Sequence, residues 1–89
     1  MRADKFLKLT RIVKRRSLAN ELCGAERVKV NNKIAKASTK IKEGDIIEIR
    51  YGNKLTKLIV KEVPVFNEIN KEKAKELVEI IETIILEEL

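Results

Sequence analysis

The chain has 89 residues, the size of a single small domain. Charged residues make up 38% of it and hydrophobic residues 44%, so it has enough apolar side chains for a core and is not expected to be disordered. It contains no His and a single Cys, Cys23, which excludes an intramolecular disulfide and a thiolate metal cluster and disfavours enzymatic activity. No apolar run reaches membrane length, so we expect a cytoplasmic protein that does not bind a membrane. We also expect that the protein is not an enzyme and uses no metal or cofactor.

The charge is unevenly distributed along the chain. Residues 1–42 hold 13 Lys and Arg against 3 Asp and Glu, a balance of +10, whereas residues 43–89 hold 7 against 11, a balance of −4. A basic half of this kind is typical of a surface that meets a polyanion. A cationic membrane helix is the rival interpretation, but the basic half lacks the Trp- and Leu-rich face of such helices.

Basic and apolar residues are interleaved through residues 2–22. Phe6, Leu9 and Val13 recur at helical spacing, which predicts short helices over residues 3–9 and from residue 15 or 16 to Gly24. The segment KRRS, residues 14–17, opens the second helix, where cations oppose the helix dipole but form a phosphate site with the free backbone N–H groups. We expect these cations to converge on one exposed patch.

From Arg27 the apolar period changes to two. The alternation through residues 27–36, with Asn31-Asn32 as a tight turn, predicts a basic hairpin, and residues 38–40 form a loop. A turn at Gly44 launches a strand over residues 46–51, and a second turn at residues 52–53 leads to a long strand over residues 54–63. These two strands are expected to pair as an antiparallel hairpin.

The last third of the chain is interpreted as a connector, residues 64–70, and an amphipathic helix over residues 71–86. Asn70 is its expected N-cap, and Ala74, Leu77, Val78 and Ile81 belong to its apolar stripe. Packing on its own sheet is the default, and a groove-docked or dimerising helix is the alternative. The expected fold is α+β, with two N-terminal helices packed on a small, curved, mostly antiparallel sheet, plus a C-terminal helix. Its parts are residues 1–63, 64–70 and 71–89.

Motifs of nucleotide binding and of catalysis are absent, which leaves nucleic acid. The chain has only three aromatic residues, so it cannot supply a row of platforms for unstacked bases. Contacts to the phosphates and 2′-OH groups of structured RNA are expected instead. A DNA-binding helix-turn-helix competes, but its recognition helix would offer only Asn20 to the bases. The candidate basic residues are Arg2, Lys5, Lys8, Arg11, Lys14, Arg15, Arg16, Arg27, Lys29, Lys33, Lys36 and Lys40.

Three segments together resemble the S-four RNA-binding domain family. They are MRADKFLKLTRIVKRRSLANEL, RVKVNNKIAKAS and KEGDIIEIRYG, and the match covers roughly residues 1–63. The family positions matched here are Arg2, Asp4, Lys5, Arg11 and Arg16, with Arg27, Asn31 and the loop of residues 33–40, so Asn31 joins the candidate RNA-binding residues. Ala3 stands where the family often has Leu, and Glu26 and Asn32 stand where it often has Gly.

Among free-standing members, the chain is most similar to the bacterial ribosome-quality-control factors of the RqcP type. It is more distantly similar to the ribosome-associated heat-shock protein of the same domain type. The resemblance implies a protein without an active site, expected to be a monomer, that binds large ribosomal subunits obstructed by peptidyl-tRNA. It implies contacts to large-subunit rRNA and tRNA, and joint action with an RqcH-like factor while alanine tails are added.

Other functions remain open from the sequence. A general role in ribosome assembly or heat-shock recovery would use the same RNA-binding surface. A protein-interaction module would act through the Ile-rich tail helix instead, and an accessory domain would guide an RNA-modifying enzyme.

Overall fold

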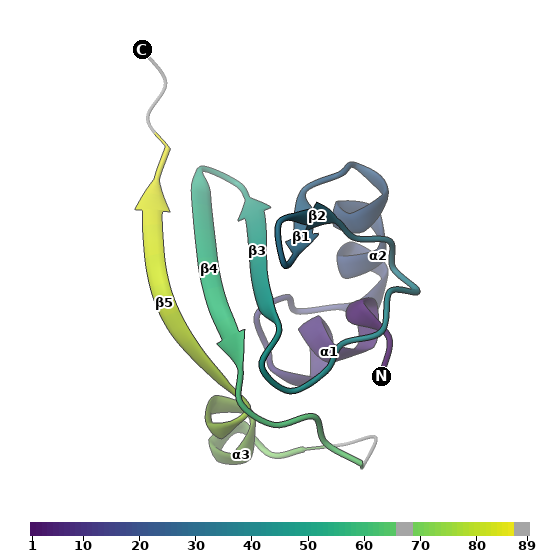
Figure 1. Cartoon of the computed structure of the whole chain (residues 1–89), viewed down its shortest axis with the longest axis vertical. Helices are drawn as coiled ribbons and strands as arrows, with labels where there is room; N and C mark the ends of the chain where they lie inside the picture. The colour runs from purple at the N-terminus through teal and green to yellow at the C-terminus, as the bar shows by residue number, and fades with distance from the viewer. Residues whose placement is uncertain (66–68, 87–89) are drawn as a thin grey trace.

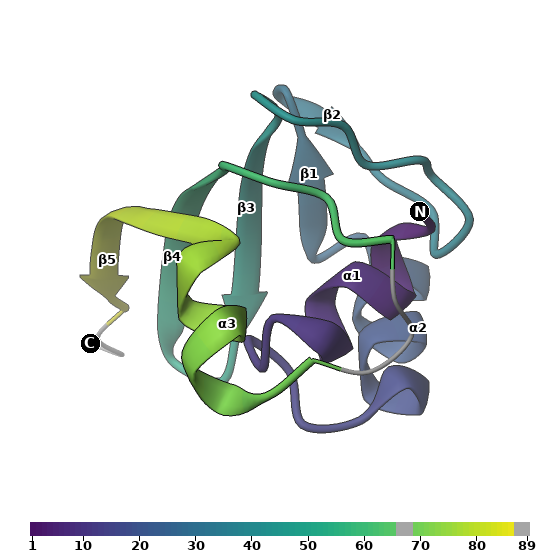
Figure 2. The ribbon, with the colours of Figure 1, turned by 90° about the horizontal axis from the view of Figure 1, so that it is seen from below.

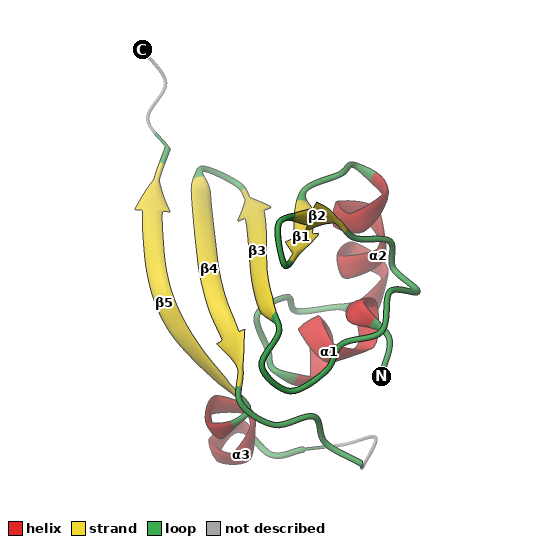
Figure 3. Ribbon diagram, viewed as in Figure 1, coloured by secondary structure: helices red, strands yellow, loops and turns green. Residues whose placement is uncertain are grey.

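The structure is a computed structural model that describes residues 1–65 and 69–86. Parts of the expected connector and of the C-terminal helix, residues 66–68 and 87–89, therefore lie outside the described residues. The described elements are α1 (Ala3–Leu9), α2 (Arg16–Gly24), β1 (Val28–Val30), β2 (Lys33–Ile34), β3 (Ile46–Tyr51), β4 (Lys54–Val60), α3 (Lys71–Glu76) and β5 (Val78–Ile85). They form an α+β fold, as predicted (Figures 1 and 3).

Both N-terminal helices have the bounds expected from the sequence. Thr10 closes α1 because its hydroxyl donates to the carbonyl of Phe6 at 2.8 Å, and Arg11 then turns the chain with a φ of 62°. Gly24, which the sequence indicated as the end of α2, is the last helical residue, but it does not take the left-handed conformation that often follows a helix. The left-handed residue is Glu26, with a φ of 61°. Its N–H donates to Cys23, and the Arg27 N–H donates to Leu22, the hydrogen bonds of a Schellman motif.

The sheet has the strand order β2-β1-β3-β4-β5, and each neighbouring pair is antiparallel. Asn31 and Asn32 make the β1–β2 turn with φ values of 51° and 68°, and Gly44 has a φ of 90°, so the predicted turns are confirmed. The strand that was expected to continue to residue 63 ends at Val60. The N–H groups of Lys61 and Glu62 both donate to the Leu77 carbonyl, which draws the chain out of the sheet.

The predicted helix over residues 71–86 is wrong in most of its length. Only Lys71–Glu76 is helical, with the Asn70 side chain accepting from the Lys73 N–H at 2.8 Å, as the N-cap prediction requires. Val78–Ile85 form β5, which pairs with β4 from Val60↔Val78 to Lys54↔Ile85. Because β4 would otherwise be an open edge, its backbone groups offer this segment hydrogen bonds that a helix could not use.

The core lies between the two N-terminal helices and one face of the sheet (Figure 2). The largest fully buried side chains come from α1, from the segment after it, from the strands and from the residue before β5. They are Phe6, Leu7, Val13, Val28, Ile47, Leu58, Val60 and Leu77. Leu77 is fully buried, so the C-terminal segment completes the same core that the helices and the first strands form.

Candidate nucleic-acid interface

Two of the candidate cations are held at the helix junction by one buried carboxylate. Asp4 lies in the first turn of α1 and forms two ion pairs. Its Oδ1 lies 3.2 Å from Arg2 Nε, and its Oδ2 lies 3.3 Å from Arg16 Nε. The Lys5 backbone N–H also donates to Asp4 Oδ1, at 2.8 Å. The Asp4 side chain is only 3% exposed, whereas Arg2 and Arg16 are each 49% exposed. The carboxylate therefore joins the two helices while both arginine side chains stay about half exposed.

The protonation of Asp4 follows from these partners. Burial by itself raises the pKa of the Asp4 carboxyl, but the hydrogen bond and charge of Arg16 oppose it. The hydrogen bonds from Arg2 and from the Lys5 N–H act in the same direction, so the pKa lies below the ordinary 3.8. Asp4 is thus ionised at neutral pH and fixes the two arginines in place.

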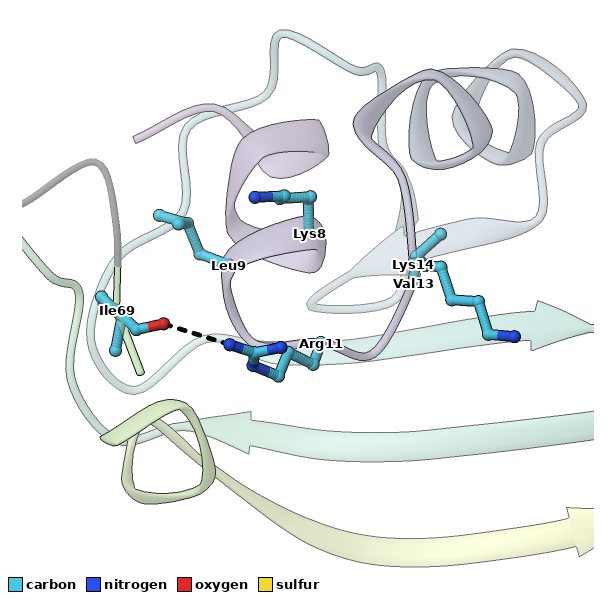
Figure 4. Close-up of a pocket in the computed structure, with 6 residues that line it drawn as sticks. All are labelled: Lys8, Leu9, Arg11, Val13, Lys14 and Ile69. Carbon is cyan, nitrogen blue, oxygen red and sulfur yellow. Dashed lines mark hydrogen bonds between the residues drawn. The ribbon is translucent and has the colours of Figure 1, made fainter. Parts of the chain in front are cut away.

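Three further candidates lie at the other end of α1, around a shallow hollow. Lys8, Arg11 and Lys14 line it together with Leu9, Val13 and Ile69. Arg11 Nη2 donates to the Ile69 carbonyl at 3.4 Å, a contact between α1's end and the connector (Figure 4). Figure 4 shows Lys8 and Arg11 extending towards Ile69, whereas Lys14 points the opposite way. All three residues line the same hollow, but the Lys14 side chain extends away from Ile69.

The start of α2 has the electrostatic character expected of an anion site. Arg15 is exposed and occupies the N-cap position in an extended conformation, with no side-chain cap and no acid in the first turn of the helix. Lys40 is brought to this end of the molecule by a bridge between its backbone and that of Arg2. Lys36 lines a separate hollow beside α2 with Asn20 and Cys23, and Lys5 lies on α1 between Arg2 and Lys8.

Two basic candidates of the predicted hairpin, Arg27 and Lys29, lie away from the N-terminal helices. Lys29 alternates with Val28 and Val30, which pair with the core residues Ile49 and Ile47, so its side chain points to the sheet face away from the helices. Arg27 lines a hollow there with Lys29, and Arg50, which sequence reasoning missed, lines it too. The signal for Arg50 was its alternation with the buried Ile49 along β3. Lys33 is exposed on β2, at the edge of the sheet.

Asn31 has a structural task in this fold. Its amide donates to Asp45 Oδ1 at 3.0 Å and its carbonyl oxygen accepts from the Ile46 N–H at 3.0 Å. Asp45 Oδ2 also accepts from the Lys42 N–H at 2.8 Å. Asn31 therefore ties the β1–β2 turn to the start of β3, and its polar atoms are already engaged.

Cys23 and the acidic side chains are the remaining groups with reactive chemistry among the described residues. Burial, and then the charge of Asp4, raise the pKa of the Cys23 thiol, so Cys23 is a protonated core residue. In the part of the chain that the structure describes, no group of three or more Cys, Asp or Glu side chains could hold a metal ion. Among residues 1–65 and 69–86, no helix is both long and apolar enough to cross a membrane.

An open antiparallel sheet with two basic N-terminal helices on one face defines a small α+β domain, and comparisons with known proteins agree with this class. The S4 domain family matches residues 1–47. The RQC P-site tRNA stabilizing factor of Streptococcus pneumoniae is 47% identical over 88 residues, covering 99% of this chain and 98% of that protein. The factor of the same name from Halalkalibacterium halodurans is 46% identical over 80 residues, covering 90% of this chain and 89% of that protein.

A solved structure shares most of this architecture. Trimeric Heat Shock Protein 15 of Vibrio cholerae superposes with a TM-score of 0.82 at 27% identity, covering 90% of this chain and 80% of that one. The chain belongs to the S4 domain family, which confirms the resemblance drawn from its motifs.

Proposed function

We propose that this protein is a non-catalytic RNA-binding factor that holds tRNA and large-subunit rRNA together on obstructed large ribosomal subunits. Its near full-length similarity to proteins named RQC P-site tRNA stabilizing factor supports the quality-control role. The observation that supports the RNA contact is the pair of half-exposed arginine side chains, Arg2 and Arg16, fixed by Asp4 beside the uncapped start of α2.

Phosphate is the ligand that this corner fits best. A guanidinium presents five donors, and Asp4 occupies only part of those of Arg2 and Arg16. The first N–H groups of α2 add the positive end of the helix dipole, and exposed Arg15 stands at that end. A phosphate arriving here also relieves the repulsion among the cations, so binding gains from both effects.

The other basic residues extend this site along α1. Lys5 and Lys8 follow Arg2 at intervals of three residues, and Arg11 comes after the helix end, so the strip runs for about 10 Å along a helix of this length. We assign most phosphate contacts to Arg2, Lys5, Arg11, Arg15 and Arg16, with Lys8, Lys36 and Lys40 around them. The remaining candidates would contact only an RNA that extends beyond this strip. They are Lys14, Arg27, Lys29, Asn31 and Lys33.

Recognition of this kind depends on RNA shape. The sole described aromatic side chain with substantial exposure is Tyr51, 43% exposed on β3, so the protein has no row of stacking platforms. Cations that meet phosphates and 2′-OH groups suit the folded backbone of tRNA and rRNA. We further propose that the protein acts as a monomer in the cytoplasm, supports alanine tailing by an RqcH-like factor, and makes its RNA contacts through residues 1–63.

Co-sedimentation with purified large subunits tests this function, using subunits that carry or lack peptidyl-tRNA. We expect binding to require peptidyl-tRNA and to weaken in the variant Lys8→Gln/Arg15→Gln. The matched control is Lys54→Gln/Lys75→Gln, which removes the same charge from exposed positions on β4 and α3. Equal losses in both variants would contradict the assigned surface.

A general heat-shock role is the second candidate, because Heat Shock Protein 15 shares the fold. The same experiment separates the two functions. Binding that is equally tight without peptidyl-tRNA would favour the heat-shock or assembly role and count against stalled-chain rescue.

A further inference from the structure

The strand β5 is an open edge of the sheet. It is last in the strand order, and Figure 1 shows it at the left side of the molecule with no element beyond it. Every residue from Glu79 to Ile85 is exposed. The strand lies at the opposite end of the sheet from β1 and β2, and α1 and α2 lie beside that other end (Figure 1).

The ladder with β4 determines which backbone groups of β5 are free to pair. The Leu86 N–H donates to the Asn53 carbonyl at 2.6 Å, and in an antiparallel ladder every second residue bonds to the partner strand. The backbone N–H and C=O groups of Ile84, opposite Leu55, therefore point to β4. Thr83 and Ile85 lie between these positions and direct their N–H and C=O groups to the open side. An irregularity opposite Lys57 and Leu58 shifts the register, after which Ile80, opposite Leu58, again faces outwards.

The side chains along this edge combine apolar surface with negative charge. Ile80, Ile81, Ile84 and Ile85 are 39–54% exposed, which is unusual for β-branched aliphatic residues. Glu79 and Glu82 lie opposite Ile59 and Lys57, on the sheet face turned away from the helices, and β5 holds no Lys or Arg. An extended strand laid along this edge would cover the isoleucines and meet the two carboxylates.

Charge decides what kind of strand fits. A second copy would bring its own Glu79 and Glu82 against the same glutamates, and its β5 has no Lys or Arg to pair with them. A strand with Lys or Arg alternating with aliphatic residues places its cations on the face of Glu79 and Glu82 and its aliphatic side chains beside Ile80 and Ile85.

We propose that β5 is a docking edge for another protein, which adds an extended segment of alternating Lys or Arg and aliphatic residues as a sixth strand. The main-chain bonds come from Ile80, Thr83 and Ile85, and the side chains provide the selectivity. This proposal does not depend on RNA binding, because the basic helices lie at the other end of the sheet. An interface of one short strand is small, as in transient complexes.

NMR on the full chain tests the proposal, with a synthetic eight-residue peptide that alternates Lys and Val as the probe. We expect it to slow amide exchange at Ile80, Thr83 and Ile85 at least tenfold, while Ile84, already bonded to β4, changes little. A peptide that alternates Glu and Val should bind at least tenfold more weakly. Glu79→Lys should lower the affinity for the Lys peptide by about three- to tenfold, and the control Glu43→Lys should leave this affinity unchanged.

Four results would overturn the proposal. Unchanged exchange at the three amides with the Lys peptide would mean that the glutamates only keep the edge unpaired. Equal binding of the Lys and Glu peptides would refute the charge argument. Protection of these amides in a dimer, seen by sedimentation without peptide, would make the occupant a second copy. Protection by an RNA oligonucleotide would assign the edge to RNA.

Discussion

Replacing Asp4 by Asn removes the charge that joins α1 to α2 while keeping the size of the side chain. Asn retains an oxygen for the Lys5 N–H, but its amide cannot accept from both Arg2 and Arg16. A hydrogen bond to a charged group contributes about 1.5–3 kcal/mol. Because both guanidiniums are half exposed and can rehydrate, we assign about 1 kcal/mol to each. The variant should lose about 2 kcal/mol at pH 7, a fall of roughly 8–16 °C in Tm for a domain of this size.

Urea denaturation across pH checks the origin of this loss. The folded-state pKa of Asp4 lies below 3.8, so the unfolded chain takes up the proton first as the pH falls. The charge therefore stabilises the fold fully above about pH 5 and loses its contribution as the pH falls through 3.8 to the folded value. The stability difference between wild type and Asp4→Asn should narrow between pH 6 and pH 3. A difference that stays constant would refute the reasoning.

Two substitutions test other parts of the fold. Glu26→Gly should raise stability by about 1 kcal/mol, because Glu26 holds a φ of 61° that Gly adopts without strain; an unchanged Tm would count against the Schellman motif. Leu77→Ala should cost about 2–5 kcal/mol, because Leu77 is fully buried although it lies beyond the matched S4 segment. Ile81→Ala, at a position 51% exposed, is its control and should change the unfolding free energy by no more than about 0.5 kcal/mol, as is usual for surface sites. Equal losses in the two variants would contradict the placement of the C-terminal segment.

Local signals predicted the first 60 residues well. The helices, the Asn31-Asn32 turn and the β3–β4 hairpin each depend on residues close together in sequence, such as Gly44 at its positive φ. After α2, Glu26 and not the nearby Gly24 takes the left-handed conformation. Sequence rules assign that conformation to Gly first.

The C-terminal segment was predicted as a helix but forms a strand, for a physical reason. Its apolar residues satisfy helical spacing, yet six of the eight residues of β5 are Val, Ile or Thr, which favour strands. The choice between the two depends on the open edge of β4, which only the folded sheet provides. The S-four resemblance did not cover this segment, so it could not correct the periodicity.

The candidate site was predicted in its composition but not in its arrangement. The cations of α1 and α2 were recognised from the sequence, and Asp4, matched there as a family position, pairs with Arg2. That Asp4 also holds Arg16, 12 positions away, depends on how the helices pack. The same link makes Arg16→Ala a poor test of RNA binding, because it also disturbs the buried carboxylate. Exposed Lys8 and Arg15 are better positions for such a test.

The salt dependence of binding to peptidyl-tRNA-bearing large subunits tests the central claim most directly. Five phosphate contacts predict that log K falls against log salt with a slope of about −3.5 to −4.5. Of the two residues changed in Lys8→Gln/Arg15→Gln, only Arg15 is among the five, so this variant should reduce the magnitude of the slope by about 0.7–0.9, whereas Lys54→Gln/Lys75→Gln should leave it unchanged. A wild-type slope near zero, or the same reduction in the control, would contradict an RNA interface built on the two N-terminal helices.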